Sequence, residues 1–597
     1  MNKSLPIQQN KLFSSYGGVE SIIDTIDDIS IKIEPFDKWQ PLYQNVCKGR
    51  NSELLLDEPR LCSRVKSLGF ENLTRFFMPD TSLSDDPAFN PNCPNRNEKS
   101  KMVPTTYFPT WFYCPKCHQF KPLQEWRTVW ETAIDTKFDD YVPACGYCGG
   151  AGKKPKRPKL QQTRFIMVSM ETGKIADIPW KKVFAKRGIS DSKNALVWKF
   201  DDDSPEAKSV TYHVSDASTN LSRISVQNEK GEKVSLSDIF SHYIVIDVDG
   251  KPTVFRPAVK SDNNVYYAYN LNCIYIPQYI ITQNDVDNIR QVYEEDGITN
   301  PSKIKRNQHL KCSEEDIKQI IESGFAVPTP KYRSENQFRI EEFDFLTNKD
   351  NYTNGVYEDN ENNENNRLTS YDYSYAGSKP KFIKEIFYQT RLNVTTVQIA
   401  YSRIDKIGLD SLQYWKGKNP DPKKWYDVNR DTVTDVDVAL RPTCASNIKG
   451  IEKMPALSSF GEGFLVALDL DYIPEEGRMT FMHTLCHLLM KEMEFVCGYP
   501  ISSMSERLYY MPNQNKYGFM IYSVGGSSGS YGGISSLFES GNIEKIIENA
   551  SLMAEDCQND PICSTEGGHC FACVHIPETA CEQFNQYLSR NVFNKYK

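Results

Sequence analysis

The stretch "GGHCFACVHIPETACEQFNQYLSR", residues 567–590, holds three cysteines and two histidines ahead of a helix-forming run. Cys570 and Cys573 form a C-x2-C pair, a spacing that lets two thiolates converge on one metal ion. Cys557 and Cys563 lie shortly before the pair. This density of cysteine predicts a closed zinc site that ties the end of the chain to the elements before it.

A fifth cysteine, Cys581, follows the pair. Four ligands complete a tetrahedral zinc shell, so one of the five cysteines is spare. The sequence predicts that Cys581 starts the terminal helix, where the helix dipole favours a thiolate. Cys557 and Cys563 then compete for the remaining place beside the C-x2-C pair. A closed shell of this kind stabilises a fold and is poor at activating water.

A second cysteine cluster lies near the N-terminus. "YCPKCHQF" supplies Cys114 and Cys117, and "ACGYCGG" supplies Cys145 and Cys148. Two C-x2-C pairs provide four thiolates for one ion, and the glycines after the second pair permit a tight turn. The pattern predicts a second structural zinc site; the alternatives are an iron–sulfur cluster or two unmetallated pairs. The two clusters together predict about two zinc ions per chain.

A basic loop, "KKPKRPK", follows the first cluster directly. One interpretation is a contact with the phosphates of a DNA strand; the other is a solvated surface loop. The candidate DNA-binding residues are Lys153, Lys154, Lys156, Arg157 and Lys159.

Four histidines accompany the C-terminal cysteines. His483 and His487 are spaced i, i+4 in "HTLCH", so both lie on one helix face, a spacing that can bind zinc. The glutamate of the H-E-x-x-H motif is missing, so the sequence favours buried, hydrogen-bonded histidines over a metal or catalytic role. His569 and His575 could replace a cysteine ligand but are expected to flank the site.

A glycine-rich loop, "SVGGSSGSYGGISSL", follows a predicted strand and precedes a predicted helix. Such a loop could hold a phosphate at the helix N-terminus, but it matches no defined fingerprint. A flexible strand–helix connection is the favoured interpretation. No Walker-type phosphate loop occurs in the chain, so the sequence predicts no ATPase.

Bulk composition is that of a folded protein of several domains. The chain has 597 residues, 17 cysteines and a formal charge of -8, so any nucleic-acid contact must come from a local basic patch. No apolar run is long enough to span a membrane, and the N-terminus has no apolar core of a signal peptide. We expect a cytoplasmic protein with no membrane contact, in which clustered cysteines bind metal rather than form disulfides.

Periodicity predicts an α+β, multidomain fold: a β-rich central body with a zinc ribbon, and a C-terminal strand–loop–helix domain closed by a second zinc site. The predicted parts are an N-terminal α/β region (1–104), the zinc ribbon with the basic loop (105–160), a β-rich body with a helical end (161–343), a flexible linker or insertion (344–377), a mixed strand region (378–480) and the C-terminal zinc-binding domain (481–597).

Several of these stretches resemble the DrmB family, a component of the DISARM anti-phage defence system. The resemblance is carried at the C-terminus by "CQNDPIC", "HCFACVHIPETACEQFNQYLSR", "FMHTLCHLLMKEMEFVCGYPISSMSERLYY" and "GFMIYSVGGSSGSYGGISSL". Further upstream it includes "SSYGGVESIID", "FPTWFYCPKCHQFKPL" and "MPALSSFGEGFLVAL", in the family's order. The P-E-T-x-C-E stretch is the most specific piece. The C-terminal module of this family is also found fused to certain helicases.

The resemblance implies a function. DrmB proteins are accessory subunits that join the DrmA helicase in a DNA-binding complex, so the expected role is a non-catalytic subunit that binds a DrmA-type helicase and helps engage DNA. The family's cysteine positions carry over onto all nine clustered cysteines. This chain departs from the family in having no cysteine between Cys148 and Cys273, so no middle zinc site is expected. The alternative function is a metal-dependent hydrolase or nuclease that uses His483 and His487.

Overall fold

The computed structural model forms two compact units, each assembled from separate stretches of the chain. Unit 1 comprises residues 1–56, 76–271 and 396–457, and unit 2 comprises 57–75, 272–395 and 458–597. The structure describes residues 12–14, 17–25, 29–39, 55–79, 103–134, 138–139, 143–149, 157–185, 189–192, 195–215, 220–277, 283–308, 310, 312, 314–325, 334–359, 366–405, 422–443, 448–524 and 532–597.

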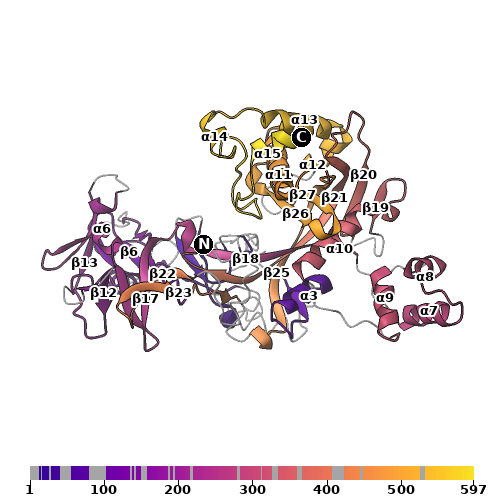
Figure 1. Cartoon of the computed structure of the whole chain (residues 1–597). Helices are drawn as coiled ribbons and strands as arrows, with labels where there is room; N and C mark the ends of the chain where they lie inside the picture. Colours follow the sequence, from indigo (N-terminus) through magenta and orange to yellow (C-terminus); the bar gives the residue numbers. More distant parts are fainter. Residues whose placement is uncertain are drawn as a thin grey trace. The chain divides into compact units, whose positions relative to one another are not determined.

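Unit 1 is built on two six-stranded sheets. In order across the first sheet, the strands are β10 (Ile175–Ala176), β9 (Phe165–Val168), β17 (Lys251–Val259), β16 (Tyr243–Val248), β12 (Ala195–Phe200) and β11 (Ile189–Ser192). The second sheet runs β15 (Lys233–Ser235), β14 (Ile224–Asn228), β13 (Val210–Val214), β7 (Gln119–Pro122), β6 (Trp111–Tyr113) and β8 (Gln161–Gln162). Figure 1 shows these strands in purple and magenta.

The two sheets share one apolar core, which also takes in the short helix α6 (Leu236–Phe240). Phe165, Trp198 and Phe255 of the first sheet pack with Phe120 and Tyr212 of the second. Alternate residues of β13 and β14 are buried, as expected for a sheet with one covered face, whereas β9 is buried on both faces. Unit 1 also contains a three-stranded sheet of β1 (Ile22–Asp24), β2 (Ser30–Ile33) and β5 (Thr105–Tyr107), and the hairpin of β22 (Lys423–Asp427) and β23 (Thr432–Val436).

Unit 2 is organised around a sheet that carries helices on both faces. Its main path is β19 (Val356–Glu358), β20 (Leu368–Tyr373), β21 (Ile383–Ser402), β25 (Lys453–Leu468), β27 (Lys516–Val524) and β26 (Met504–Met511). β4 (Arg75–Phe77) and β18 (Tyr267–Ile274), which each lie partly in unit 2, belong to this sheet as well. The short strands β3 (Leu55–Leu56) and β24 (Arg441–Pro442) are in unit 1. Phe464 and Val466 of β25 face one core, and Leu465 and Ala467 between them face another. Because side chains alternate along a strand, this one sheet separates two apolar cores.

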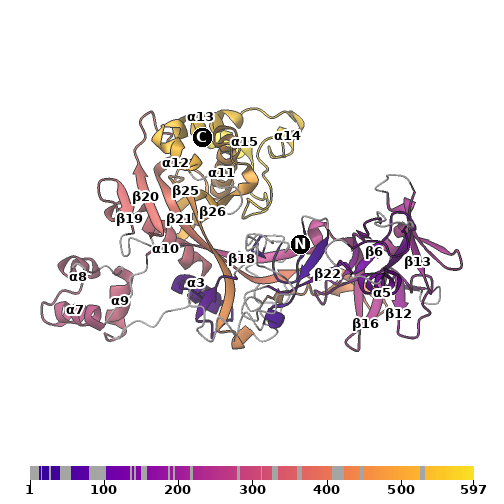
Figure 2. The same ribbon diagram turned by 180° about the vertical axis from the view of Figure 1, so that it is seen from behind.

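The first of these cores holds helices that come after β25 in sequence. They are α11 (Glu475–Cys497), α12 (Gly533–Glu539), α13 (Asn542–Met553) and α15 (Arg590–Tyr596). Figures 1 and 2 both show them gathered against β26 and β27. The second core is covered by α10 (Glu335–Thr347), which begins with a capping box at Ser334 and Gln337. The helix α3 (Pro59–Ser67) contacts α10.

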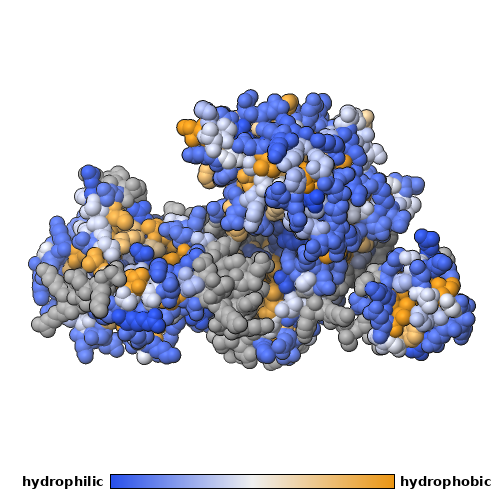
Figure 3. Space-filling model, in the orientation of Figure 1, coloured by the Kyte–Doolittle hydropathy of each residue, from blue (hydrophilic) through white to orange (hydrophobic). Residues whose placement is uncertain are grey.

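Three short helices form a separate core within unit 2. They are α7 (Gln283–Glu294), α8 (Pro301–Asn307) and α9 (Glu314–Glu322), and they pack through Ile289, Ile304 and Ile317. Among the described helices, none has the length and apolar character needed to cross a membrane. The face shown in Figure 3 is largely hydrophilic, with apolar side chains in small separate patches.

The structure confirms the predicted fold class of mixed helices and strands with a β-rich body. The six-part division of the chain stays a prediction. Within the predicted linker 344–377, however, the described residues include the end of α10 and the strands β19 and β20. Aromatic contacts such as Phe345 with Tyr357 and Tyr371 with Tyr388 anchor this stretch, which its high content of Asn and Glu concealed. The most polar part, 360–365, lies outside the described residues.

Candidate metal centres

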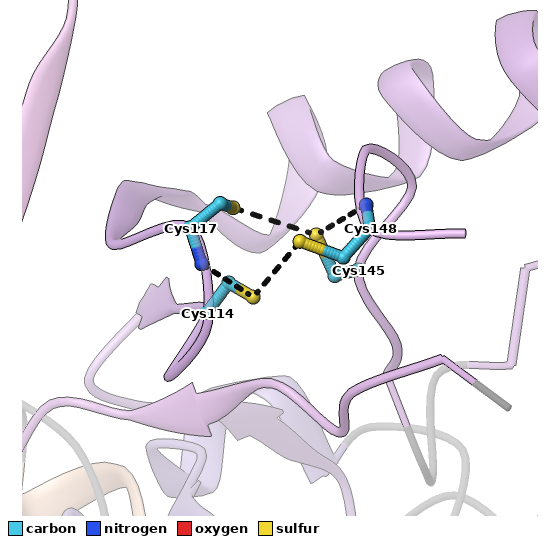
Figure 4. Close-up of side chains that lie close together, drawn as sticks. All are labelled: Cys114, Cys117, Cys145 and Cys148. Carbon is cyan, nitrogen blue, oxygen red and sulfur yellow. Dashed lines mark hydrogen bonds between the residues drawn. The ribbon is translucent and has the colours of Figure 1, made fainter. Parts of the chain in front are cut away.

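The N-terminal cysteine cluster is assembled by a hairpin and a loop of unit 1. Cys114 and Cys117 lie in the turn between β6 and β7, and Cys145 and Cys148 lie in the loop after α5 (Leu123–Ile134). Figure 4 shows the four thiols facing one another. The Sγ atoms of Cys114 and Cys148 are 3.8 Å apart, as are those of Cys117 and Cys145. All four sulfurs lie within 4.8 Å of one another, close enough to share one ion.

Neighbouring groups hold these thiols in place. The N–H groups of Lys116 and Cys117 point at Cys114 Sγ, at 3.4 and 3.5 Å, and the Cys148 N–H points at Cys145 Sγ, at 3.4 Å. Burial raises the pKa of the Cys114 thiol, but the two N–H groups outweigh burial, so that its pKa lies below the ordinary value. Donors aimed at sulfur favour the thiolate, which is the form that binds metal.

Arg157, one of the predicted DNA contacts, stabilises the loop that carries Cys145 and Cys148. Its Nη1 donates to the carbonyl oxygens of Cys145 and Gly146, at 3.1 and 2.9 Å, and its guanidinium lies over the ring of Trp130. The guanidinium of Arg157 is therefore engaged by groups of the protein itself. Lys159 is exposed and forms a backbone bridge with Ala144. The other predicted contacts, Lys153, Lys154 and Lys156, lie outside the described residues.

The C-terminal cluster brings together Cys557, Cys563, Cys570 and Cys573, again with all sulfurs within 4.8 Å. Sγ–Sγ distances are 3.5 Å for Cys557 and Cys570 and 3.6 Å for Cys563 and Cys573. Burial raises the pKa of the Cys570 thiol, but contacts with Cys557, the Cys573 backbone and Asn559 outweigh it and bring the pKa to about 6. Cys557 and Cys563, which compete for one place in the sequence-based prediction, therefore both lie in this cluster.

The terminal helix is held against this cluster by its first residue. Arg590 is 2% exposed. Its guanidinium pairs with Asp560 and donates to the Glu555 carbonyl, and its backbone N–H donates to Gly568. The prediction that the cluster ties the last helix to the preceding elements agrees with these contacts.

The predicted place of Cys581 is wrong. The terminal helix α15 begins at Arg590, with Ser589 as its cap, and residues 582–585 form turns. Cys581 therefore gains nothing from a helix N-terminus. Nor does it join the other C-terminal cysteines: its nearest metal-binding neighbours are His483, His487 and Glu506. The sequence offered five cysteines for four places and gave no means of seeing that Cys581 belonged elsewhere.

His483 and His487 are fully buried on α11, and both are hydrogen-bonded. Their common neighbour, Glu506 on β26, was not identified from the sequence. A signal was present, because Glu506 and Arg507 are adjacent charges in the otherwise apolar strand "MSERLYYM". Alternation sends Glu506 to the face covered by α11 and Arg507 to the face covered by α10, where it pairs with Glu342. His569 and His575 contact each other, Nδ1 to Nε2, at 3.2 Å.

The glycine-rich loop precedes α12, and residues 525–531 lie outside the described part. The N-terminus of α12 already has an anion, the buried carboxylate of Glu462 on β25. It accepts the N–H groups of Gly532, Ile534 and Ser535 at 3.0–3.1 Å, and the Ser535 hydroxyl at 2.7 Å. A phosphate would have to displace this carboxylate, so the geometry does not favour a phosphate site here.

Comparisons with known proteins match parts of the chain. Residues 8–267 match a family described as a domain of unknown function (DUF8724). The DISARM protein DrmB of Bacillus paralicheniformis is 34% identical over 126 residues, which is 19% of this chain and 22% of that protein. The match thus spans about a fifth of the length of DrmB.

The solved structure of the DUF1998 helicase MrfA bound to DNA is similar to part of this chain. The similarity covers 40% of this chain and 25% of the MrfA chain, with 10% sequence identity. The TM-score of 0.23 does not establish a common fold.

Proposed function

We propose that this chain is an accessory subunit of a DISARM-type anti-phage defence complex, in which it binds a DrmA-type helicase and helps engage DNA. The observation that carries the proposal is the 34% identity to the DISARM protein DrmB. The two four-cysteine clusters support it, because they fall on the cysteine positions of the resemblance, one in each unit. On this proposal the chain supplies binding surfaces and leaves ATP hydrolysis to its partner.

Each four-cysteine cluster is proposed to hold one structural zinc ion. Thiolates are soft ligands, four of them complete a tetrahedral zinc shell, and the N–H groups aimed at sulfur stabilise the charge. The ion in unit 1 would join the β6–β7 hairpin to the loop 145–148. The ion in unit 2 would join the end of α13 to the segment before α15.

Partner binding is tested by co-expressing the full chain with a DrmA-type helicase and isolating one of the two by an affinity tag. We expect a stable complex on size exclusion, and tighter binding of DNA by the complex than by either protein alone. Separate elution of the two folded proteins at micromolar concentration would contradict the proposed partnership.

The DNA contact is tested on the basic loop. Replacing Lys153, Lys154, Lys156 and Lys159 together by Ala should weaken DNA binding and lower the slope of log K against log salt by about 0.9 for each phosphate that the variant no longer neutralises. Arg157 stays intact, because its removal would disturb the cysteine loop. A matched control replaces the exposed Lys208 and Lys230 of the same unit. Equal slopes for both variants would remove the basic loop from the DNA contact.

The hydrolase alternative finds no support in the geometry. A catalytic site needs a path for its substrate, but His483 and His487 are both 0% exposed. Each also uses Nδ1 for a backbone carbonyl. We therefore do not propose a reaction at these residues.

A further inference from the structure

A third group of metal-binding side chains lies in unit 2, apart from the four-cysteine cluster. His483 and His487 come from α11, Glu506 from β26 and Cys581 from the segment that precedes α15. One ligand atom from each lies within 4.8 Å of every other. The four side chains are between 0% and 5% exposed, so water cannot hydrate the polar atoms they bring together.

The hydrogen bonds of the two histidines fix which ring nitrogen is free. Nδ1 of His483 lies 2.8 Å from the carbonyl oxygen of Gln586, and Nδ1 of His487 lies 2.8 Å from that of Val574. A carbonyl oxygen only accepts, so both Nδ1 atoms carry hydrogen. In the neutral rings both Nε2 atoms therefore present lone pairs to the centre of the group. Metal-bound histidines usually have this arrangement of an outer carbonyl partner and an inner lone pair.

The carboxylate faces these lone pairs. Nε2 of His483 is 3.0 Å from Oε1 of Glu506, and Nε2 of His487 is 3.2 Å from Oε2. Among the described residues, no hydrogen-bond partner meets His487 Nε2 or Glu506 Oε2, although both atoms are buried. Two acceptors opposed in a dry interior are unfavourable unless a cation lies between them.

The thiol completes the group. Sγ of Cys581 is 3.4 Å from Nε2 of His483 and receives the backbone N–H of Asn585 at 3.2 Å. The same N–H to sulfur contact occurs in both four-cysteine clusters. Phe584 and Asn585 adopt left-handed φ values of 52° and 57°, a conformation uncommon for Phe. Two hydrogen bonds join the chain around Cys581 to β26. The Glu506 N–H donates to the Ala580 carbonyl at 3.1 Å, and the Glu582 N–H donates to Oε1 of Glu506 at 2.8 Å.

We propose that His483, His487, Glu506 and Cys581 bind a third zinc ion, which is structural. Two neutral imidazoles, a carboxylate and a thiolate are all zinc ligands, and the two anions neutralise Zn²⁺. With four protein ligands and no exposed face, the ion has no open position for water or substrate. Because the site is sealed, the ion would enter as unit 2 folds. It would join α11, β26 and the segment before α15.

A proton is the competing occupant. One proton shared between His483 and Glu506 would make an ion pair, but it would leave His487 Nε2 and Glu506 Oε2 opposed. A second proton, on His487, would place two imidazolium ions beside one carboxylate. The two occupants differ in metal content and in the atoms bound to zinc, and both differences can be measured.

The test measures zinc in the full-length protein. Elemental analysis after zinc loading and desalting should give about three zinc ions per chain, and X-ray absorption at the zinc edge should show imidazole nitrogen among the bound atoms. The two four-cysteine clusters contribute sulfur alone. About two zinc ions bound only by sulfur would overturn the proposal, and so would iron or copper in place of the third ion.

Variants locate the third ion. Cys581→Ser and His487→Gln should each lose about one zinc ion per chain and the imidazole signal, because a closed tetrahedral site tolerates no missing ligand well. The control is Cys312→Ala, which alters a buried thiol in the separate core of α7, α8 and α9. It should keep about three zinc ions. If the variants do not fold, the absorption spectrum of the unaltered protein decides the question. Unchanged zinc content in folded Cys581→Ser and His487→Gln would refute the site.

Discussion

Glu342 and Glu341 show how burial controls the contribution of an ion pair to the stability of this protein. Glu342 is 0% exposed on α10, and its carboxylate lies 2.5 Å from Arg507 Nε and 3.4 Å from Arg60 Nη2. Both arginines are 2% exposed. Removing one member of a buried ion pair leaves an uncompensated charge, which costs more than the pair itself contributes. Glu341, the preceding residue, also contacts Arg60, at 3.1 Å, but its side chain is 34% exposed.

Glu342→Gln should therefore lower the free energy of unfolding by about 3 kcal/mol, since it leaves two buried guanidinium groups without their shared carboxylate. Glu341→Gln should cost less than about 1 kcal/mol, because water screens that pair. Urea unfolding followed by far-ultraviolet circular dichroism measures both values, because the long helices α10 and α11 lie in unit 2. Equal losses in the two variants would show that burial does not control the strength of these pairs.

Glu335 predicts a dependence of stability on pH. Burial raises the pKa of its carboxyl, but Arg339, Arg507 and Arg64 outweigh burial and lower the pKa from 4.5 to about 2. A depressed pKa gives stability that is full above pH 4.5 and is lost as pH falls towards 2. Its side chain is 37% exposed, so the contribution is about 1 kcal/mol. Glu335→Gln should be less stable than the parent by that amount at pH 7 and equal to it near pH 2, in thermal unfolding across this range. A difference that stays constant with pH would contradict this assignment.

At the scale of elements, α12 depends on a carboxylate from another strand. Glu462 of β25 accepts three N–H groups at the start of α12 and also the Tyr499 hydroxyl at 2.9 Å. Burial raises the pKa of Glu462, but the Ser535 and Ile534 donors and Tyr499 outweigh it, and the pKa lies below its usual value. This contact joins β25 to the helix that follows the glycine-rich loop.

Glu462→Ala should lower the free energy of unfolding by about 2–3 kcal/mol, because several buried donors lose a charged acceptor. Glu539→Gln, an exposed change at the other end of α12, should stay within about 0.5 kcal/mol. Differential scanning calorimetry compares the two. A loss in the Glu462 variant no larger than in the control would mean that α12 does not need this cap.

The elements themselves were largely predictable, and the contacts between them were not. Periodicity predicted the β-rich body that contains β9, β12, β13 and β16, and the spacing of His483 and His487 placed both on one helix, which is α11. The spacing of C-x2-C pairs identified cysteines that the structure brings together. Glu506 and Cys581 lie far from His483 in sequence. Only the register of β26 in the sheet and the turn before α15 bring these residues together. Neither the register nor the turn can be recognised from a short stretch of sequence. The composition of 344–377 also hid two strands, because polar residues dominate a stretch whose few aromatic residues pack.

At the scale of the whole molecule, the two units are interleaved in sequence. The segment 396–457 belongs to unit 1, although more than a hundred residues of unit 2 precede it. Arg403, 0% exposed, donates to the carbonyls of Gly173 and Val265. Gln398 bonds to Gly17 and Val19 at 3.1 Å. The segment thus satisfies backbone groups of the N-terminal stretches.

A fragment of residues 8–267, the part that matches DUF8724, should therefore not reach the fold of unit 1 by itself. Its amide signals in NMR should be poorly dispersed, because carbonyls that Arg403 and Gln398 now satisfy would be left without partners. Co-expression of 396–457 as a second fragment should restore dispersion. A well-dispersed spectrum of 8–267 alone would show that the late segment is dispensable.

The same interleaving sets the order of events on the ribosome. Gly17 and Gln398 lie 381 residues apart in the chain, so the bond between them cannot form until most of the protein has been synthesised. At about 5–20 residues per second, the N-terminal strands wait roughly 20 seconds or longer for their last partner. The β6–β7 hairpin and the loop 145–148 are synthesised within that interval and are available to a metal ion before Gln398 is added. If the first cysteine cluster holds zinc as proposed, the ion can bind before the unit that contains the cluster is complete, and it would then stabilise this part of the chain during synthesis.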